Sequence, residues 1–395
     1  MSSLVSKQTK NIEKANNQHK SSKLPNRGKM DMVFFGCVMV LLTVGLIMMF
    51  SASYAFAYYN YGNSYKFIIR QAEFAVIGVV AMIAISYVDY RWLAKKAIPW
   101  IVYGGSVAML ALVLALPPMQ DDFDYKRWIA FGGFSFQPSE VAKFAIILLF
   151  SYLIAKNHKR MQEFKFGICY FFALLGIVCG LLVLEPHLSA TILVFAIGVI
   201  LMIVGGIKMK HMAIIGGVGV LGVAGIVLSG AVSYAFSRFQ YWLDPWADAT
   251  GKGYQTIQSL LAIGSGGLWG RGLGNSRQNY LWVPEPHNDF IFSIVCEELG
   301  LIGAVCILIG FGILIWRGVM IAMRAPDRFG SLLAMGIIFQ IGLQTALNIL
   351  VVTNTIPNTG ISLPFFSYGG TSLLMLLGQM GIILSISRSS RVRKR

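Results

Sequence analysis

Ten apolar runs divide this chain, and each approaches the roughly 17–25 residues that a helix needs to cross a bilayer. Hydrophobic residues make up 56% of the chain and charged residues only 13%, whereas a soluble domain carries roughly 25% charged residues. The sequence therefore predicts an all-α polytopic membrane protein with about ten transmembrane helices. The expected spans are residues 32–55, 72–88, 98–116, 141–155, 166–184, 189–207, 213–229, 290–316, 330–353 and 372–386.

The distribution of charge orients these spans. Most of the 33 Lys and Arg residues fall in the two terminal tails and in alternate short connections, which is the cytoplasmic bias of membrane proteins. We therefore expect both termini in the cytoplasm. The net charge of +16 then reflects orientation, and it indicates no nucleic-acid partner. Membrane lipids are expected partners of the spans, and for the basic N-terminal tail solvation is a simpler interpretation than contact with anionic headgroups. Residues 1–30 are interpreted as a disordered basic tail, residues 31–388 as the transmembrane domain and residues 389–395 as a second basic tail.

Three segments on the outer side are too long or too irregular to be simple turns. They are residues 117–137, 230–289 and 354–370, of which the second is a large extracellular loop between the seventh and eighth spans. Most of the acidic residues also lie on this side, although orientation does not require them there. Irregular backbone near a membrane is tolerated where it lines a cavity. If the helices form one bundle, the three segments should meet above a common cavity.

Asp289 stands at the mouth of the eighth span, after a Pro-Glu-Pro-His-Asn sequence. This position favours a helix N-cap, where a carboxylate accepts free backbone N–H groups. A general base is the alternative, and burial or the neighbouring Glu285 would raise the pKa of Asp289 for that task. Glu297 and Glu298 follow about 12 Å deeper in the span, where ionisable groups face the protein interior and find partners.

Glu140 and Lys143 open the fourth span three residues apart, so their side chains share one helix face. Two interpretations remain open: a self-neutralising pair, or a lysine held for an anionic ligand, because cations are otherwise disfavoured near a helix N-terminus. Arg127 and Trp128 lie in the preceding loop, beside several acids. That composition favours a local salt-bridged loop.

Arg271 and Arg277 flank a Gly-rich stretch at residues 264–274. Glycines allow backbone N–H groups to form an anion-binding nest, but the stretch matches neither a Walker A sequence nor a dinucleotide fingerprint. Flexibility is the simpler interpretation. His187, after the fifth span, is interpreted as structural. The five cysteines lie inside apolar runs, which indicates neither a disulfide nor a zinc site.

Six short motifs occur in order along the chain. They are Gln-Pro-Ser-Glu-x-x-Lys, Gly-Lys-Gly-Tyr-Gln, Ala-Ile-Gly-Ser-Gly-Gly, Pro-Glu-x-His-x-Asp-Phe-Ile-Phe, Glu-Glu-Leu-Gly and Leu-Pro-Phe-x-Ser-Tyr-Gly-Gly-Thr-Ser. Together they resemble the SEDS family, which includes FtsW, RodA and SpoVE, over everything except the N-terminal tail. The last motif and the Leu-Glu-Pro at residues 184–186 look more like FtsW or SpoVE than RodA, which favours the cell-division member.

The resemblance implies a peptidoglycan glycosyltransferase that polymerises lipid II, the undecaprenyl-pyrophosphate-linked disaccharide-pentapeptide, on the outer face of the cytoplasmic membrane. The implied partners are a class B penicillin-binding protein and other division proteins at the septum. The essential acid of the family falls on Asp289. The family commonly has Asp where this chain has His187, which leaves the role of that turn open. The substrate-binding candidates are Arg127, Trp128, Glu140, Lys143, Arg271, Arg277, Glu285 and His287.

In the expected reaction, Asp289 takes the proton of the acceptor sugar 4-hydroxyl as that oxygen attacks the anomeric carbon of the donor. Lys143, Arg127 and either Arg271 or Arg277 would stabilise the departing pyrophosphate. Mg²⁺ or Mn²⁺ is a further candidate for this role, and no cofactor is firmly predicted. A lipid II flippase is the rival interpretation, and an elongation or sporulation paralogue would share the chemistry. A scaffold that only recruits the transpeptidase leaves the inward-facing acids and lysine unexplained.

Overall fold

The computed structural model describes residues 28–116, 127–131, 134–185, 187–208, 210, 213, 216, 241–251, 253–278 and 286–392. Within these residues, eight helical segments are long and apolar enough to cross a membrane, which confirms the predicted polytopic helical fold. They are α2 (Met32–Tyr61), α3 (Lys66–Tyr87), α4 (Ala97–Ala115), α5 (Pro138–Lys156), α6 (Phe171–Leu184) with the preceding π-helical turn η3 (Lys165–Tyr170), α11 (Ile291–Met323), α12 (Arg328–Val352) and α13 (Gly370–Val392).

Two of the ten expected spans stand apart from these eight. The sixth forms α7 (Leu188–Val204), an apolar helix of only 17 residues. The seventh, residues 213–229, lies outside the described residues except for 213 and 216. The predicted outer segment 117–137 contains a short antiparallel hairpin, in which Ile129 pairs with Phe136. The remaining elements are β1 (Ile129–Phe131), β2 (Phe134–Phe136), η1 (Tyr90–Ala94), η2 (His158–Gln162), η4 (Pro245–Asp248) and α10 (Tyr254–Gly266).

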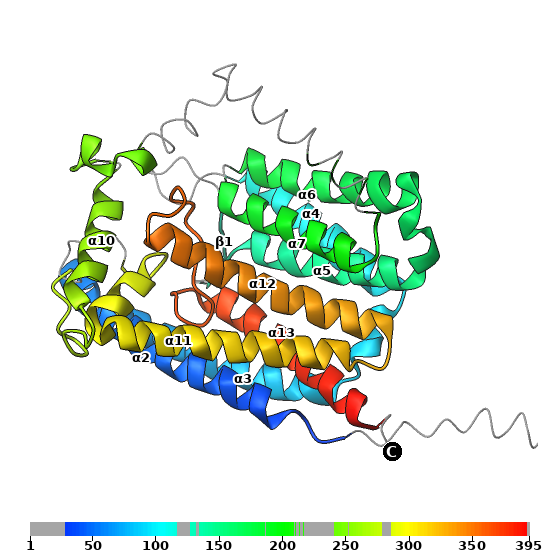
Figure 1. The fold of residues 1–395 in the computed structure, drawn as a ribbon, viewed down its shortest axis with the longest axis horizontal. Coiled ribbons are helices and arrows are strands. Elements are labelled where there is room, and N and C mark those ends of the chain that lie inside the picture. The colour runs from blue at the N-terminus through cyan, green and yellow to red at the C-terminus, as the bar shows by residue number, and fades with distance from the viewer. Residues whose placement is uncertain are drawn as a thin grey trace, which may run out of the picture.

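Helix α5 lies in the middle of the bundle, and most of its residues are buried. It packs against α4, α7 and α12, while α13 packs along α3, and α11 lies against α12 and α2. Figure 1 shows the long helices side by side, with α10 and β1 at one end and the C-terminus at the other. The Gly28 N–H donates to the Arg388 carbonyl oxygen at 3.1 Å. Both ends of the described chain therefore lie together, as the charge bias requires.

The large outer loop docks onto α11 through glycines. The turn that follows α10 meets α11 where Gly300 has a φ of 67° and leaves helical geometry, and backbone hydrogen bonds join the two segments on both sides of this kink. The approach is close, because a Cβ atom on Gly266 would overlap the carbonyl oxygen of Cys296. Gly264, half a turn earlier in α10, faces open space.

We expect Gly266→Ala to lower the thermal stability of the protein, because the added methyl group forces α10 away from α11. Overpacking of this kind costs about 1–3 kcal/mol. Gly264→Ala is the matched control, and there alanine should be neutral or stabilising by about 0.5–1 kcal/mol through its higher helix propensity. Thermal denaturation of the two variants in detergent measures the difference. Equal midpoints would show that the close contact does not hold α10 in place.

Candidate functional site

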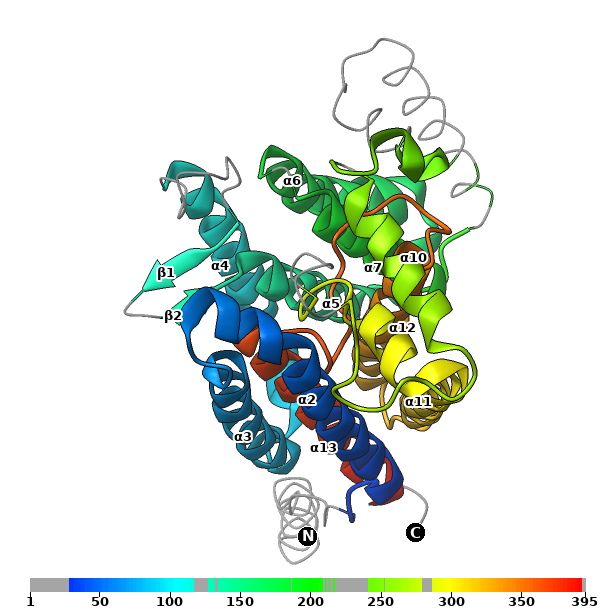
Figure 2. The same cartoon turned by 90° about the vertical axis from the view of Figure 1, so that its left-hand side faces the viewer.

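The predicted outer segments meet at one end of the bundle. Figure 2 looks onto that end and shows the β1–β2 hairpin and α10 on opposite sides, with the segment that joins α12 to α13 crossing between them. The N-terminal ends of α5, α7 and α11 reach the same face. Segments far apart in the sequence therefore converge at this end of the bundle.

Glu140 and Lys143 form a buried ion pair at the start of α5. Pro138 occupies the first turn of this helix, a position that suits proline because its missing N–H has no helical partner there. The Lys143 Nζ atom lies 2.7 Å from Glu140 Oε1, and the side chains are only 3% and 10% exposed. The i,i+3 spacing predicted the pairing correctly. A lysine buried this deeply beside a single carboxylate has further N–H donors that a ligand could use.

The turn between α6 and α7 places two more titratable groups beside this pair. His187 Nε2 lies 3.5 Å from Gln137 Nε2, at the N-cap of α5. Burial, followed by the positive charges of Arg127 and Lys143, lowers the pKa of His187 to about 3. Burial raises the pKa of Glu185 to about 7, against the opposing effect of Arg127. These mutual effects place Arg127, Lys143, Glu185 and His187 in one region.

Several buried atoms of this region have no hydrogen-bond partner among the described residues. They are Ser139 Oγ, Glu185 Oε1 and His187 Nδ1. Buried polar atoms are almost always paired with protein, water or ligand, and leaving one unpaired costs about 1–3 kcal/mol. Such a cluster is typical of a site that receives a polar ligand. Trp128, next to Arg127, is 40% exposed and presents an aromatic ring at the same end of the molecule.

Asp289 lies in a turn at residues 286–290 that is tied to the segment before α13. The Asn348 side-chain amide donates to the carbonyl oxygen of Asp289 at 2.7 Å and to that of Ile361 at 2.6 Å. Ser367 Oγ donates to the carbonyl oxygen of Asn288 at 2.8 Å. The N-cap of α11 is Phe290, which makes no side-chain cap bond. The interpretation of Asp289 as the N-cap is therefore wrong by one residue.

The Asp289 carboxylate is close to Gly360 and to the start of α7. A Cβ atom on Gly360 would lie 3.1 Å from Asp289 Oδ2 and 3.8 Å from Ser189 Oγ. Ser189 follows His187 by two residues, so the carboxylate lies beside the same helix end that carries the Glu185–His187 turn. The structure thus brings Asp289 to the region of Arg127, Glu140 and Lys143.

His287, a predicted substrate-binding residue, lies among aromatic rings. Its side chain is 3% exposed and its ring centroid lies 4.5–5.8 Å from those of Phe56, Phe67 and Tyr368. Burial lowers the pKa of His287 to about 4, so the ring is neutral at physiological pH. His287 therefore anchors the turn by packing, and its contact with substrate stays a prediction. Glu285 lies outside the described residues.

The segment that holds Arg271 and Arg277 binds a carboxylate of the protein itself, that of Glu297. The Arg277 N–H donates to Glu297 Oε1 at 3.0 Å and Ser276 Oγ donates to Oε2 at 2.5 Å. Arg271 Nε lies 3.8 Å from Glu297 Oε1. The donors to Glu297 follow the Gly-rich stretch, whose last glycine, Gly274, donates its backbone N–H to Glu298 instead. Arg271 thus helps to dock the outer loop, whereas Arg277 contributes its backbone N–H and is exposed, and substrate binding by either arginine stays a prediction.

Glu298 is bound by the same segment, through the backbone N–H groups of Gly274 and Ser276, and also by α2. Ser51 Oγ of α2 lies 2.6 and 2.8 Å from the two carboxylate oxygens of Glu298. No group of three or more His, Cys, Asp or Glu side chains with metal-binding geometry occurs among the described residues. A Mg²⁺ ion can be held by one or two carboxylates together with substrate phosphates. Since the chain itself offers no such cluster in the described part, we derive no step through a metal.

Sequence reasoning did not identify Glu185, Asn348 or Gly360 as site residues. Asn348 is fully buried within a predicted span, and a polar amide inside an apolar run is itself a signal, because the bilayer cannot satisfy it. Glu185 carried a weaker signal, as an acid next to a span end. Gly360 carried none, since its role depends on a left-handed φ of 70° and on a contact with a distant residue.

The raised pKa of Glu185 predicts a pH-dependent stability. The folded protein keeps this proton up to about pH 7, whereas the unfolded chain releases it near pH 4.5. Stability from this group is therefore present below pH 4.5 and is lost as the pH rises towards 7, by at most about 3 kcal/mol. Glu185→Gln should flatten the fall in thermal midpoint between pH 5 and 8. Glu163→Gln, at an exposed ion pair, should leave it unchanged. Equal falls in wild type and Glu185→Gln would contradict the assignment.

The chain resembles known proteins over most of its length. The family described as "Cell cycle protein" (FtsW, RodA, SpoVE) matches residues 31–392. The chain is 42% identical to stage V sporulation protein E of Bacillus subtilis over 91% of its length and 98% of that protein. It is 36% identical to a probable peptidoglycan glycosyltransferase FtsW of Geobacter sp. over 91% of its length and 97% of that protein.

Solved structures share the fold. One solved structure concerns the structural coordination of polymerization and crosslinking by a peptidoglycan synthase complex. A chain of that structure matches this chain with a TM-score of 0.73 and 26% sequence identity, and the match covers 91% of this chain and 98% of that one. The rod shape determining protein RodA of Thermus thermophilus has a TM-score of 0.66 at 24% identity, with 91% and 97% covered. The chain therefore belongs to the FtsW/RodA/SpoVE family of cell cycle proteins.

Proposed function

We propose that the protein is a peptidoglycan glycosyltransferase that polymerises lipid II on the outer face of the cytoplasmic membrane. The observation that carries this proposal is the approach of the Asp289 carboxylate to the helix end beside Glu140, Lys143 and Arg127. An acid and two cations at one end of a membrane bundle suit a lipid-linked pyrophosphate substrate. The names of relatives as peptidoglycan glycosyltransferases support the same reaction.

The proposed reaction joins two lipid II molecules. The 4-hydroxyl oxygen of the acceptor sugar bonds to the anomeric carbon of the donor, the bond from that carbon to the pyrophosphate oxygen breaks, and Asp289 takes the hydroxyl proton. General-base catalysis of this kind contributes about 10²–10⁴-fold. The leaving pyrophosphate gains negative charge, so cations held in a dry site stabilise it most.

Lys143 and Arg127 are the proposed cations. Glu140 holds Lys143 in place at 2.7 Å, which leaves the other donors of the ammonium for a phosphate oxygen. Arg127 lies at the entry to β1, where its charge already acts on Glu185 and His187. Arg271 lies beside Glu297, and we leave it outside the reaction.

The partner of the proposed enzyme is a class B penicillin-binding protein that crosslinks the new strands. The likeness to a chain from a peptidoglycan synthase complex supports this assignment. We further propose a role in septal synthesis with other division proteins, although identity to a sporulation protein is also high. Both roles use the same chemistry, so the proposed functions of Asp289, Lys143 and Arg127 apply to either role.

One observation favours a lipid II flippase as the second candidate. The buried side chains of Gln340, Gln344 and Asn348 form a stripe at i, i+4 and i+8 along α12 that continues from the site into the middle of the bundle. A flippase needs such a polar path to extend through both leaflets. Purified protein in vesicles that carry labelled lipid II in one leaflet separates the two functions. Translocation without glycan strands would favour the flippase, and glycan strands without translocation would favour the polymerase.

Asp289→Asn should abolish most glycan synthesis. The change keeps the size of the side chain and leaves the Asn348 contact to the main-chain carbonyl of Asp289, so the thermal midpoint should stay near that of the wild type. We expect a loss of at least about 100-fold in gel-detected strands from purified lipid II, with the partner transpeptidase present. Asp244→Asn is the control, because Asp244 caps η4. Near-normal polymerisation by Asp289→Asn would refute the catalytic assignment.

Gly360→Ala should impair polymerisation more than stability. Gly360 and Gly62 both have a left-handed φ, of 70° and 68°, and alanine at either position costs about 1–2 kcal/mol. Only Gly360 adds a contact with the Asp289 carboxylate, since nothing lies within 4 Å of a Cβ on Gly62. A displaced base should reduce activity on the order of 10- to 100-fold. Comparable activities of the two variants, measured at equal folded protein, would show that Gly360 does not position Asp289.

A further inference from the structure

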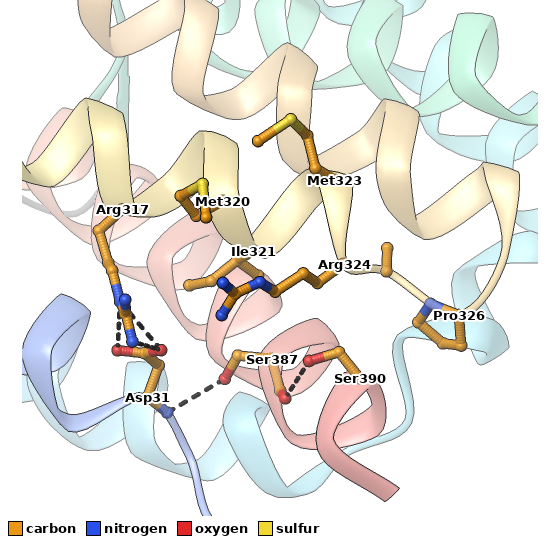
Figure 3. A pocket seen from close by; sticks show the side chains of 10 residues that line it. Asp31, Arg317, Met320, Ile321, Met323, Arg324, Pro326, Ser387 and Ser390 are labelled. Carbon is orange, nitrogen blue, oxygen red and sulfur yellow. Dashed lines mark hydrogen bonds and ion pairs between the residues drawn. The ribbon is translucent and has the colours of Figure 1, made fainter. Parts of the chain in front are cut away.

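A pocket of about 480 Å³ opens at the end of the bundle opposite the candidate site around Asp289 and Lys143. It lies between the start of α2, the end of α11 and the last turns of α13 (Figure 3). This is the end at which both described chain ends meet. Its lining combines two arginines, one aspartate, two serines and an apolar wall made of Met320, Ile321, Met323, Ala325 and Pro326.

Two of the charged residues satisfy each other. Arg317 Nε lies 3.1 Å from both carboxylate oxygens of Asp31, and Arg317 Nη2 lies 2.8 Å from Oδ2. The same carboxylate caps α2 by accepting the Phe34 N–H at 3.1 Å. Asp31 is only 5% exposed. This fork-shaped pair is neutral overall and fixes one wall of the pocket, so Asp31 does not repel an anion as an isolated carboxylate would.

Arg324 supplies the remaining positive charge. Figure 3 shows its side chain extended across the pocket, above Ser387 and towards Arg317. The Arg324 guanidinium makes no hydrogen bond or ion pair with any described residue, and only its backbone N–H is bonded, to carbonyl oxygens of α11. A guanidinium has five N–H donors and no acceptor, and because Arg324 is exposed, these donors are accessible to a phosphate that enters the pocket.

The two serines offer acceptors instead. Ser387 Oγ donates to the Leu384 carbonyl oxygen at 2.7 Å, and Ser390 Oγ donates to that of Ser387 at 2.7 Å. Ser387 Oγ also accepts the Asp31 N–H at 3.2 Å, so Ser390 Oγ is the hydroxyl with lone pairs left to accept from a hydroxyl or ammonium group. The pocket therefore pairs an anion-binding side with an acceptor side, beside methionines of which Met323 is 61% exposed.

We propose that this pocket binds the headgroup of an anionic phospholipid from the cytoplasmic leaflet. The phosphate diester contacts Arg324, a headgroup hydroxyl donates to Ser390, and an acyl chain lies along Met320 and Met323. Basic pockets between helices at the cytoplasmic side of a membrane bind such headgroups. The shared chemistry is a phosphate group, and a free phosphate in the cytoplasm is the other source of it. The proposal is independent of the glycosyltransferase reaction.

Lipid titration of the full-length protein tests the proposal without any activity assay. Phosphatidylglycerol is added to the protein in detergent, and the thermal midpoint is recorded against phosphatidylcholine at the same concentration, because a bound ligand raises the midpoint by mass action. We expect phosphatidylglycerol to stabilise the wild type and phosphatidylcholine to have no comparable effect. Equal stabilisation by the two lipids, or by inorganic phosphate in place of lipid, would overturn the assignment.

Variants of one arginine locate the site. Arg324→Ala should require at least about tenfold more phosphatidylglycerol for the same shift, as expected for loss of hydrogen bonds to a charged group. Arg324→Lys keeps the charge and should recover part of the affinity. Arg328→Ala is the matched control, because Arg328 is an exposed cation four residues away that does not line the pocket. If Arg324→Ala and Arg328→Ala titrated alike, the binding would be a general surface effect and the pocket assignment would be wrong.

Discussion

The candidate site depends on one buried amide. Asn348 joins the carbonyl oxygens of Asp289 and Ile361, which belong to two irregular segments at the end of the bundle. A bilayer cannot solvate such backbone, so its polar groups must find partners inside the protein. Each unpaired carbonyl would cost about 1–3 kcal/mol. Ser367 and Tyr368 add hydrogen bonds to the same turn, and the two segments therefore fold as one unit that sets the position of the Asp289 carboxylate.

The acids of this protein serve different purposes because their surroundings differ. Glu297 accepts hydrogen bonds from the outer loop and lies beside Arg271, so it holds that loop on α11. Glu140 is bound to Lys143 and positions a cation. Glu185 is equally buried, but one of its oxygens has no partner among the described residues. A carboxyl group in that state remains responsive to whatever charge enters the region.

Much of the fold could be predicted because the bilayer imposes one length on every span. The Glu140–Lys143 pair could be predicted as well, since three residues along a helix fix the geometry. The partner of Glu297 could not, because Arg271 reaches it only through the turn after α10 and the kink at Gly300. The start of α11 was misplaced by one residue, which changed the interpretation of Asp289. The packing of His287 against Phe56 and Phe67 could not be predicted, because these rings come from distant parts of the sequence.

The charges around Lys143 link substrate binding to protonation. With Glu140 and Lys143 neutralising each other and His187 uncharged, the local charge depends on Arg127, on Asp289 and on the proton of Glu185. An entering pyrophosphate is a like charge for an ionised Glu185, and like charges raise the pKa of a carboxyl group. Pyrophosphate binding therefore favours the protonated form of Glu185, which removes one negative charge from the surroundings of Arg127. Proton uptake and anion binding must strengthen each other, since linkage is reciprocal.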